Sequence, residues 1–546
     1  MEISLRGRLA PLLLVMAAAS APPLGAQEIL HFLQGDGRNF GQCVGGLRDV
    51  SGDGVDDILV SQSLGSSTIR VLSGADGSII HSSGLLTPDR MSRAGDVNAD
   101  GVEDYMASDE RWRPLGGDQV GMVAIWSGAD GALLRTLTGS RAQGLFGASI
   151  APAGDVNADG HDDILVGSPG YFGDVNNFAR VHSGADGSIL HEVFGSSSDA
   201  DRFGCAVAGL GDLDQDGHPD FLVGASSALA NSRGTATVYS GLTGTVLHHL
   251  IGPGTSENFG RALCGTGDLD SDGIPDFAVS HINRFNDDEG LVTVYSGAQA
   301  AVLFMVGPPP DAAVPVSFGD PLDASGDFDG DGRRDLLVGH YRSLENGYDS
   351  GEAVVYSGAD GTLLARFYGN GPDWLLGLAV AFVGNVDGDG LDDVVIGAPW
   401  ADEPYADAGA ALVYAGGAPP LLLECPAIRR ENGSDVRAQV SRATPFATVY
   451  LAGSPFGLGA TNLPQYQVTL ALRRAQIGAS RPADALGAAS FITRVPPRLY
   501  GRTIWLQAFE QARTSNWLER AVHQPWSGSG FGAPREPWWA LLDLNQ

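Results

Sequence analysis

Short apolar segments recur along this chain, and each follows a polar loop rich in aspartate and glycine. The segments are rich in β-branched residues and end in glycine or proline, as at residues 164–169 and 394–399. Such runs are typical of β-strands that stop at a turn. A second apolar segment follows in each repeat and leads through a tight turn, commonly Ala-Asp-Gly, into a last strand. Because Asp-Gly between two strands is a strong hairpin signal, each repeat is predicted to contain four strands.

The aspartate-rich loops share one nine-residue pattern that occurs seven times. They occupy residues 49–57, 96–104, 155–163, 212–220, 268–276, 327–335 and 385–393. Their starts lie 47 to 59 residues apart. Such a period indicates a repeat architecture, and four-stranded units of this kind form the blades of β-propellers. The predicted fold is therefore all-β, with a seven-bladed propeller as its main part.

The two ends of the repeat region predict how the ring closes. The seventh repeat stops at residue 417 and lacks its last strand, whereas residues 28–35 resemble the last strand of the third repeat, residues 188–195. We expect this N-terminal strand to complete the seventh blade. Closure would remove the open strand edges that a linear array of sheets exposes.

The loops have the composition of calcium sites. Oxygen-bearing side chains stand at positions 1, 3, 5 and 9, a glycine stands at position 6, and the position 7 carbonyl can add a further ligand. The predicted side-chain ligands are Asp49, Ser51, Asp53 and Asp57; Asp96, Asn98, Asp100 and Asp104; Asp155, Asn157, Asp159 and Asp163; Asp212, Asp214, Asp216 and Asp220; Asp268, Asp270, Asp272 and Asp276; Asp327, Asp329, Asp331 and Asp335; and Asn385, Asp387, Asp389 and Asp393. Up to seven Ca²⁺ ions are expected.

Two other interpretations of these loops were weighed. An EF-hand requires a glutamate at position 12, where these loops have valines such as Val60 and Val166, and a strand follows instead of a helix. Plain Asp/Gly turns without metal remain the alternative, most of all where Ser51 and Asn385 replace acidic ligands. At position 7 of the third and fourth loops, the carbonyls of His161 and His218 are expected to bind the metal and their imidazoles are not.

The charge of the chain follows from these loops. It has 65 acidic and 33 basic residues, for a net charge of −32. Predicted ligand positions account for 24 of the carboxylates. Nucleic acid is an improbable partner for such a surface, because phosphate binding needs basic residues.

The chain is predicted to have three parts. Residues 1–26 have a basic start, an apolar run and a small-residue cleavage site, which is typical of a secretory signal. Residues 27–418 form the propeller. In residues 419–546 four alternating segments, residues 447–451, 466–472, 490–495 and 503–509, predict a small β-sandwich. No later segment is apolar over the length of a bilayer, so the mature protein is expected to be secreted or at the cell surface, without a transmembrane helix.

Three cysteines, Cys43, Cys205 and Cys264, fall in the same short strand of three repeats. Buried free thiols and a disulfide between neighbouring blades are both compatible with this placement.

The long loops lie on the propeller face opposite the aspartate loops, because successive strands run in opposite directions. Aromatic residues on these loops are candidates for binding a protein or a glycan. They are Trp112, Tyr171, Phe285, Tyr341, Tyr348, Trp400 and Tyr405. The alternative is that each ring packs onto its own blade.

The flanking residues of the loops add a family resemblance. Phe-Gly precedes five loops, at residues 40–41, 146–147, 203–204, 259–260 and 318–319, and Gly-Ala-Pro follows the last loop at residues 397–399. This combination resembles the FG-GAP repeat, the unit of the integrin α-chain N-terminal propeller and of many secreted bacterial proteins. The resemblance covers roughly residues 28–417 and implies a seven-bladed propeller with calcium between the first and second strands of its blades.

The sequence favours a calcium-binding adhesion or binding scaffold over an enzyme. It contains no H-E-x-x-H, P-loop or C-x-x-C motif, and the ligand pattern accounts for each cluster of aspartates. Two alternatives remain: a propeller-based lyase or hydrolase that acts on polysaccharide, and a purely structural envelope protein.

Overall fold

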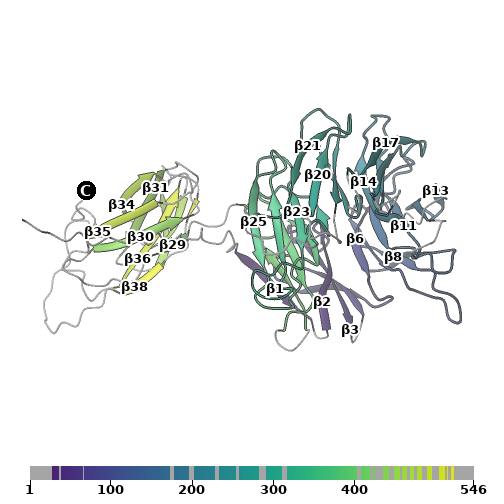
Figure 1. Ribbon diagram of the computed structural model, residues 1–546. Helices are drawn as coiled ribbons and strands as arrows, with labels where there is room; N and C mark the ends of the chain where they lie inside the picture. The colour runs from purple at the N-terminus through teal and green to yellow at the C-terminus, as the bar shows by residue number, and fades with distance from the viewer. Residues whose placement is uncertain are drawn as a thin grey trace, which may run out of the picture.

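The structure is a computed structural model (Figure 1) whose described residues contain strands and no helix. It describes residues 28–417 apart from residues 36–37, 65–66, 172–176, 196–201, 228–232, 254–257, 282–289, 310–316 and 403–407, and beyond residue 417 it describes strands alone. The predicted signal segment, residues 1–26, lies outside the described residues. No helix long and apolar enough to cross a membrane occurs in the part that is described.

Seven four-stranded antiparallel sheets form the blades of a propeller, as predicted. Blades one to three contain β2 (Arg38–Leu47), β3 (Asp57–Leu64), β4 (Thr68–Leu72) and β5 (Ile79–Ser83); β6 (Arg90–Gly95), β7 (Asp104–Asp109), β8 (Met122–Trp126) and β9 (Leu133–Thr138); and β10 (Ser149–Gly154), β11 (Asp163–Ser168), β12 (Phe178–His182) and β13 (Ile189–Phe194). Blades four to six contain β14 (Phe203–Gly211), β15 (Asp220–Ala225), β16 (Thr235–Tyr239) and β17 (Val246–Ile251); β18 (Leu263–Gly267), β19 (Asp276–His281), β20 (Leu291–Tyr295) and β21 (Val302–Val306); and β22 (Leu322–Asp323), β23 (Leu336–His340), β24 (Glu352–Tyr356) and β25 (Leu363–Tyr368).

The seventh blade confirms the predicted closure of the ring. It combines β26 (Ala379–Gly384), β27 (Asp393–Ala398) and β28 (Ala410–Tyr414) with the N-terminal strand β1 (Ile29–Gln34). Strand β1 pairs antiparallel with β28, with Phe32 opposite Leu412, and Figure 1 shows this purple strand among the green strands of the last blade. The first strands of neighbouring blades also touch, including β2 with β26. Residues almost 400 positions apart are therefore joined in one sheet.

The core lies between the blades. The second strand of a blade is covered on both faces, so all six residues of β11, β15, β19 and β27 are buried. One apolar cluster joins Leu337 and Val355 of blade six to Ile396 and Leu412 of blade seven, and similar clusters join other neighbours. Each fully buried Val, Leu or Ile contributes roughly 1.5–3 kcal/mol. Inter-blade packing is thus a major source of the stability of the ring.

The five Phe-Gly pairs lie at or just before the first strand of their blades. Their phenylalanines are buried, for example Phe259 and Phe318, each with an exposed fraction of 0%. Gly41 has φ of 81°, and a Cβ atom there would lie 2.2 Å from the carbonyl oxygen of Ala410 in the neighbouring blade. Glycine is needed at this point both for its backbone conformation and for the close approach of the next blade.

The three cysteines of the repeats are free thiols, and none of them pairs with another. Cys43 and Cys264 are buried, in agreement with the first of the two alternatives. Burial raises the pKa of the Cys43 thiol to about 11. These side chains therefore act as small apolar groups in the wall of the ring.

Beyond residue 417 the chain forms further strands. They are β29 (Leu422–Glu424), β30 (Asp435–Ser441), β31 (Thr448–Ser454), β32 (Leu458–Leu463), β33 (Val468–Leu472), β34 (Gln476–Pro482), β35 (Ala489–Arg494), β36 (Thr503–Glu510), β37 (Arg513–Thr514) and β38 (Leu518–Ala521). Each of the four predicted segments overlaps one of these strands. The strands pair in two larger sheets and one hairpin. The packing of these sheets into a sandwich stays a prediction.

Candidate functional site

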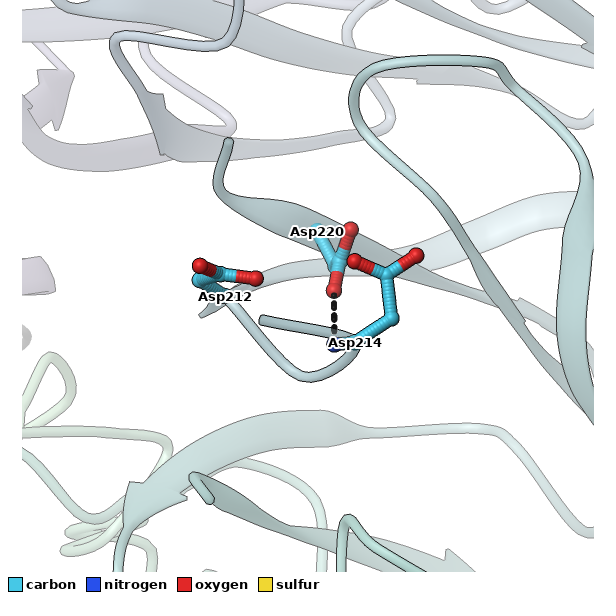
Figure 2. Close-up of side chains that lie close together, drawn as sticks. All are labelled: Asp212, Asp214 and Asp220. Carbon is cyan, nitrogen blue, oxygen red and sulfur yellow. Dashed lines mark hydrogen bonds between the residues drawn. The ribbon is translucent and has the colours of Figure 1, made fainter. Parts of the chain in front are cut away.

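The aspartate loops connect the first two strands of each blade, and the loop of blade four shows how they are built (Figure 2). The Asp212 carboxylate accepts hydrogen bonds from the backbone N–H groups of Asp216 (3.0 Å) and Gly217 (2.8 Å). The Asp216 carboxylate in turn accepts one from the N–H of His218 (2.9 Å). The loop backbone therefore holds both carboxylates in place before any ion binds.

Two positions in every loop adopt a left-handed backbone conformation. The glycine at position 6, such as Gly217 with φ of 93°, has nothing within 4 Å of the place where a Cβ atom would be. Its role is therefore conformational. Position 4 also has positive φ in all seven loops, although four of them carry a larger residue there, such as Gln215 with φ of 59°. The curvature of the loop is thus retained even where glycine is absent.

The aspartate at position 9 is buried and anchors the loop. In blade four, Asp220 has an exposed fraction of 0%. Its Oδ2 accepts hydrogen bonds from the N–H groups of Leu213 (2.7 Å) and Asp214 (3.3 Å), and its Oδ1 accepts one from Gly241 (2.8 Å) in the turn between the third and fourth strands. The same glycine contact recurs in all seven blades, at Gly74, Gly128, Gly184, Gly241, Gly297, Gly358 and Gly416. Sequence reasoning identified these aspartates as ligands and missed this structural role.

Three loops bring three carboxylates together. Each group offers one oxygen per residue, and these oxygens lie within 4.8 Å of one another. The groups are Asp212, Asp214 and Asp220; Asp268, Asp270 and Asp276; and Asp327, Asp329 and Asp335. Figure 2 shows the first group gathered around its loop. Because Ca–O distances are about 2.3–2.6 Å, oxygens this close can all contact one ion, so the residues fit a divalent cation.

The other four loops differ in the side chain at position 1 or 3. In blades two and three the Nδ2 groups of Asn98 and Asn157 donate to the carboxylates of Asp100 (2.8 Å) and Asp159 (2.9 Å). In blade one Ser51 Oγ donates to Asp49 (3.2 Å). In these loops the structure places the predicted residues on the loop, but no group of three acidic side chains converges there within the described residues.

Burial and mutual repulsion make the position 9 carboxyls hard to ionise. Burial raises the pKa of Asp104, Asp163 and Asp220 to about 6 and that of Asp335 and Asp393 to about 7. Neighbouring loop carboxylates raise these pKa values further, while hydrogen bonds from the backbone oppose the shift. A bound cation would reverse the effect, because an adjacent positive charge favours the ionised form.

Neighbouring loops are joined around the ring by residues at positions 7 and 8. The Asp162 carboxylate accepts a hydrogen bond from the N–H of Asp96 in the preceding blade (2.8 Å), and Asp392 accepts one from Asp327 (2.8 Å). At position 7, His161 Nδ1 lies 2.8 Å from the carbonyl oxygen of Val97, and the His218 ring makes the same contact with blade three. The expectation that these two imidazoles do not bind the metal stays a prediction, but sequence reasoning missed that each forms a hydrogen bond to the preceding loop.

Four further histidines connect blades in the same way. The Nε2 atoms of His31, His81, His191 and His248 contact glycine carbonyl oxygens in the next blade, at Gly74, Gly128, Gly241 and Gly297. Each histidine is the third residue of the outermost strand of its blade. Alignment of the repeats by their last strand would have revealed this position from the sequence.

The predicted ligand-face aromatics divide into exposed and packed residues. Tyr171, Tyr348 and Trp400 have exposed fractions of 45%, 71% and 45%. Trp112 instead packs against the apolar cluster of blades one and two. Tyr341 is half-buried, and the guanidinium carbon of Arg342 lies 5.8 Å from its ring centre.

The predicted residues Phe285 and Tyr405 lie outside the described residues. Sequence reasoning also missed Leu115, whose side chain stands fully clear of the fold at the tip of the long loop of blade two. Loop tips are expected to be polar, so a search for apolar residues within polar loops could have identified it.

Comparison with known proteins agrees with this architecture. The model of the FG-GAP repeat matches residues 146–183, 203–239 and 376–414, which belong to blades three, four and seven. The chain is 33% identical to integrin alpha-5 of Xenopus laevis over 215 residues, 36% of this chain and 20% of the relative. It is 30% identical to integrin alpha-V of Gallus gallus over 201 residues, 34% of this chain and 19% of the relative.

An integrin chain of Caenorhabditis elegans gives a similar result. The chain is 32% identical to integrin alpha pat-2 of Caenorhabditis elegans over 212 residues, 34% of this chain and 17% of the relative. The matches thus span about a fifth of the length of these integrin chains. The matched repeats, the seven sheets and the aspartate loops agree with one another: the chain carries FG-GAP repeats, and its ring is an integrin α-like FG-GAP propeller.

Proposed function

We propose that this protein is an extracellular, calcium-stabilised scaffold that binds a protein or a glycan on the propeller face opposite the aspartate loops. In this proposal residues 1–26 direct export, residues 27–418 form the binding propeller, and residues 419–546 form a separate β domain. In this proposal the calcium ions stabilise the propeller and are not part of the ligand site.

The proposal for calcium rests on the carboxylates that gather in the loops. The four side-chain positions of each loop and the carbonyl of position 7 would hold one ion, with Asp212, Asp214, Asp216 and Asp220 as the set in blade four. Oxygen donors without sulfur or nitrogen suit a hard cation such as Ca²⁺. Since adjacent loops are hydrogen-bonded to each other, an ion in one loop also stabilises the contact with its neighbour.

The proposal for the ligand face rests on exposed apolar residues held by ordered loops, and this is the observation that carries it. Within the blade-six loop the Gly351 N–H donates to the carbonyl oxygen of Ser343 (3.0 Å), and the Asp373 N–H donates to the backbone carbonyl oxygen of Tyr348 (2.7 Å). The blade-two loop closes through the N–H groups of Val120 and Gly121, which both donate to the Trp112 carbonyl. Rigid loops that present Tyr348 and Leu115 to solvent resemble the anchors of protein interfaces.

A binding screen of the purified chain tests this function. Panels of extracellular matrix proteins and of polysaccharides would be scored for retention by the chain, and the polysaccharides also for cleavage. The buffer contains about 1 mM Ca²⁺, which is on the order of extracellular levels. For a retained probe, Tyr348→Ala and Trp400→Ala should each weaken binding at least about tenfold, as for interface anchors.

Leu133→Ala is the matched control, because Leu133 is exposed to a similar extent (49%) on the outermost strand of blade two, away from this face. Equal weakening by Leu133→Ala, or the absence of any retained probe, would contradict the proposed face. Cleavage of a polysaccharide that is lost in Trp400→Ala would favour the enzyme alternative instead.

A further inference from the structure

The centre of the ring contains a cavity with a volume of about 580 Å³. First strands of all seven blades line it. Most of the wall is backbone or small and apolar, with residues such as Gly46, Pro152, Gly209 and Gly265. Among the described lining residues, the charged side chains are those of Arg93, Asp323 and Arg334.

Both arginines lie at one end of this cavity (the central channel), the end that the aspartate loops surround. Arg93 stands three residues before the loop of blade two, and Arg334 occupies position 8 of the loop of blade six. The Cδ atom of Arg334 lies 3.3 Å from the place where a Cβ atom of Gly267 would be. The Arg334 side chain therefore lies along the wall of blade five. Arg48, directly before the loop of blade one, is exposed at the same end.

None of these three guanidinium groups forms a hydrogen bond or an ion pair within the residues that the structure describes. The two carboxylates near Arg334, those of Asp323 and Asp392, accept hydrogen bonds from other groups. Asp323 accepts hydrogen bonds from the N–H of Phe382 (2.8 Å) and from Ser325 Oγ (3.0 Å), and Asp392 accepts one from the backbone of the neighbouring loop. Arg93 and Arg334 line the same cavity. Burial and the nearby Arg93 charge lower the pKa of Arg334, while Asp323 and Asp392 oppose this shift.

Several other arginines of the ring have partners for their guanidinium groups. Arg135 and Arg233 donate to backbone carbonyl oxygens, and three others have a carboxylate partner. Arg180 donates to Glu192 (2.7 Å), Arg261 to Asp320 (2.9 Å) and Arg366 to Glu352 (2.5 Å). The chain as a whole is strongly acidic, with 65 acidic and 33 basic residues. Arg93 is half-buried and Arg334 is exposed, so two guanidinium groups without a carboxylate partner among the described residues face one cavity.

We propose that the central channel binds a small oxyanion between the guanidinium groups of Arg93 and Arg334, with Arg48 adding positive charge at the rim. The ligand class is a carboxylate or a phosphate- or sulfate-type group. Guanidinium presents a planar fork of N–H donors that matches the paired oxygens of these anions. A cavity of about 580 Å³ also falls in the size range of small-molecule sites. This site differs from the ligand face proposed above, because Arg93 and Arg334 lie at the opposite end of the ring, beside the aspartate loops.

Isothermal titration of the calcium-loaded full chain with sulfate and, separately, with succinate tests the proposal. Both titrations are run at constant ionic strength, and the two anions distinguish the phosphate-like from the carboxylate-like source. We expect saturable binding of at least one anion with one site per chain. Arg93→Gln and Arg334→Gln should each weaken it roughly tenfold or more, the loss expected for a charge-assisted pair of hydrogen bonds.

Arg111→Gln is the control, because it removes the same charge from an exposed loop residue (66% exposed side chain) and should leave the affinity unchanged. Arg93→Lys and Arg334→Lys keep the charge but lose the planar fork, so a several-fold loss is expected for them too. They supply the test if a glutamine variant does not fold. No saturable binding of either anion, undiminished binding in the channel variants, or an equal loss in Arg111→Gln would overturn the proposal.

Discussion

The loops of blades four to six and those of blades one to three and seven have nearly the same backbone but different side-chain electrostatics. In the first group all four ligand positions are aspartates, and three carboxylates converge on one point. In the second group a serine or an asparagine replaces one aspartate, and in blades one to three that side chain donates a hydrogen bond to a neighbouring carboxylate. The carboxylates of the first group therefore repel one another more strongly, and a bound cation would relieve this repulsion. In the second group a hydrogen bond from the serine or asparagine already offsets part of it.

The comparison shows that the backbone shape of the loop and its affinity for calcium have different causes. The turn, the buried aspartate and the contact with the next blade are present in both groups, so they do not depend on the number of carboxylates. The affinity for calcium should depend on that number, because ligand charge is one of the properties that tune such sites.

Removal of calcium should have the largest effect. Three ions, each present at about 100 times its dissociation constant, would stabilise the fold by roughly 8 kcal/mol in total. Calcium-stripped protein should therefore melt about 10 °C or more below the loaded protein in a differential scanning calorimeter. Magnesium at the same concentration serves as the control for ionic strength. An identical melting temperature with and without calcium would contradict a structural role for the metal.

Substitution of the position 9 aspartate should separate anchoring from metal binding. Asp220→Ala and Asp104→Ala each leave three backbone N–H groups without an acceptor, so each should lower the free energy of unfolding by about 3 kcal/mol or more in calcium-free buffer. In calcium, Asp220→Ala should cost more than Asp104→Ala, because it also removes an ion from the first group. Chemical denaturation in both buffers checks this, and equal losses in calcium would break the comparison.

The pH dependence should not follow the division between the two groups. In the folded protein the pKa is about 7 for both Asp335 and Asp393, one from each group, against a value near 3.8 for an unperturbed aspartate. Between these values the folded state holds more protons than the unfolded state, so the stability of calcium-free protein should fall as the pH rises from about 4 to about 7.

Calcium should reverse this trend, since the ion competes with protons and binds more tightly as the carboxyls ionise. Melting temperatures at pH 5 and pH 7.5, with and without calcium, measure both slopes. A calcium-free protein that becomes more stable over this interval would contradict the assignment of buried, destabilised carboxyls.

Exchange of one ligand residue between the groups should have the smallest effect on calcium binding, but it tests the difference between the groups most specifically. Asp214→Asn makes the loop of blade four resemble that of blade two, and Asn98→Asp does the reverse. Each should change the calcium affinity of its own loop by roughly tenfold, about 1.4 kcal/mol, downward in the first case and upward in the second. Competition with a fluorescent chelator measures the change. Affinities that do not move in opposite directions would show that carboxylate number does not distinguish the groups.

Features that are local in the sequence could be predicted. The spacing of the loops gave the number of blades, and the likeness of residues 28–35 to residues 188–195 gave the strand β1 that closes the ring. Both depend on short motifs that recur from repeat to repeat and can be aligned in the sequence.

Features that depend on contacts between distant parts of the chain could not be predicted. The acceptor role of Asp220 joins residues 21 positions apart within blade four, and the contact of His218 with Val156 joins residues 62 apart in different blades. Whether Trp112 packs and Tyr348 is exposed is decided by how each long loop folds on its blade, which the composition of the loop does not specify.

A direct count of bound calcium tests the central claim. Equilibrium dialysis of the purified chain at increasing free calcium should show three ions per chain at low concentration, from blades four to six, and further ions toward seven in the millimolar range of extracellular calcium. Chains that bind no calcium at millimolar concentration would contradict the claim, as would variants of blades four to six that retain all of the tightly bound ions.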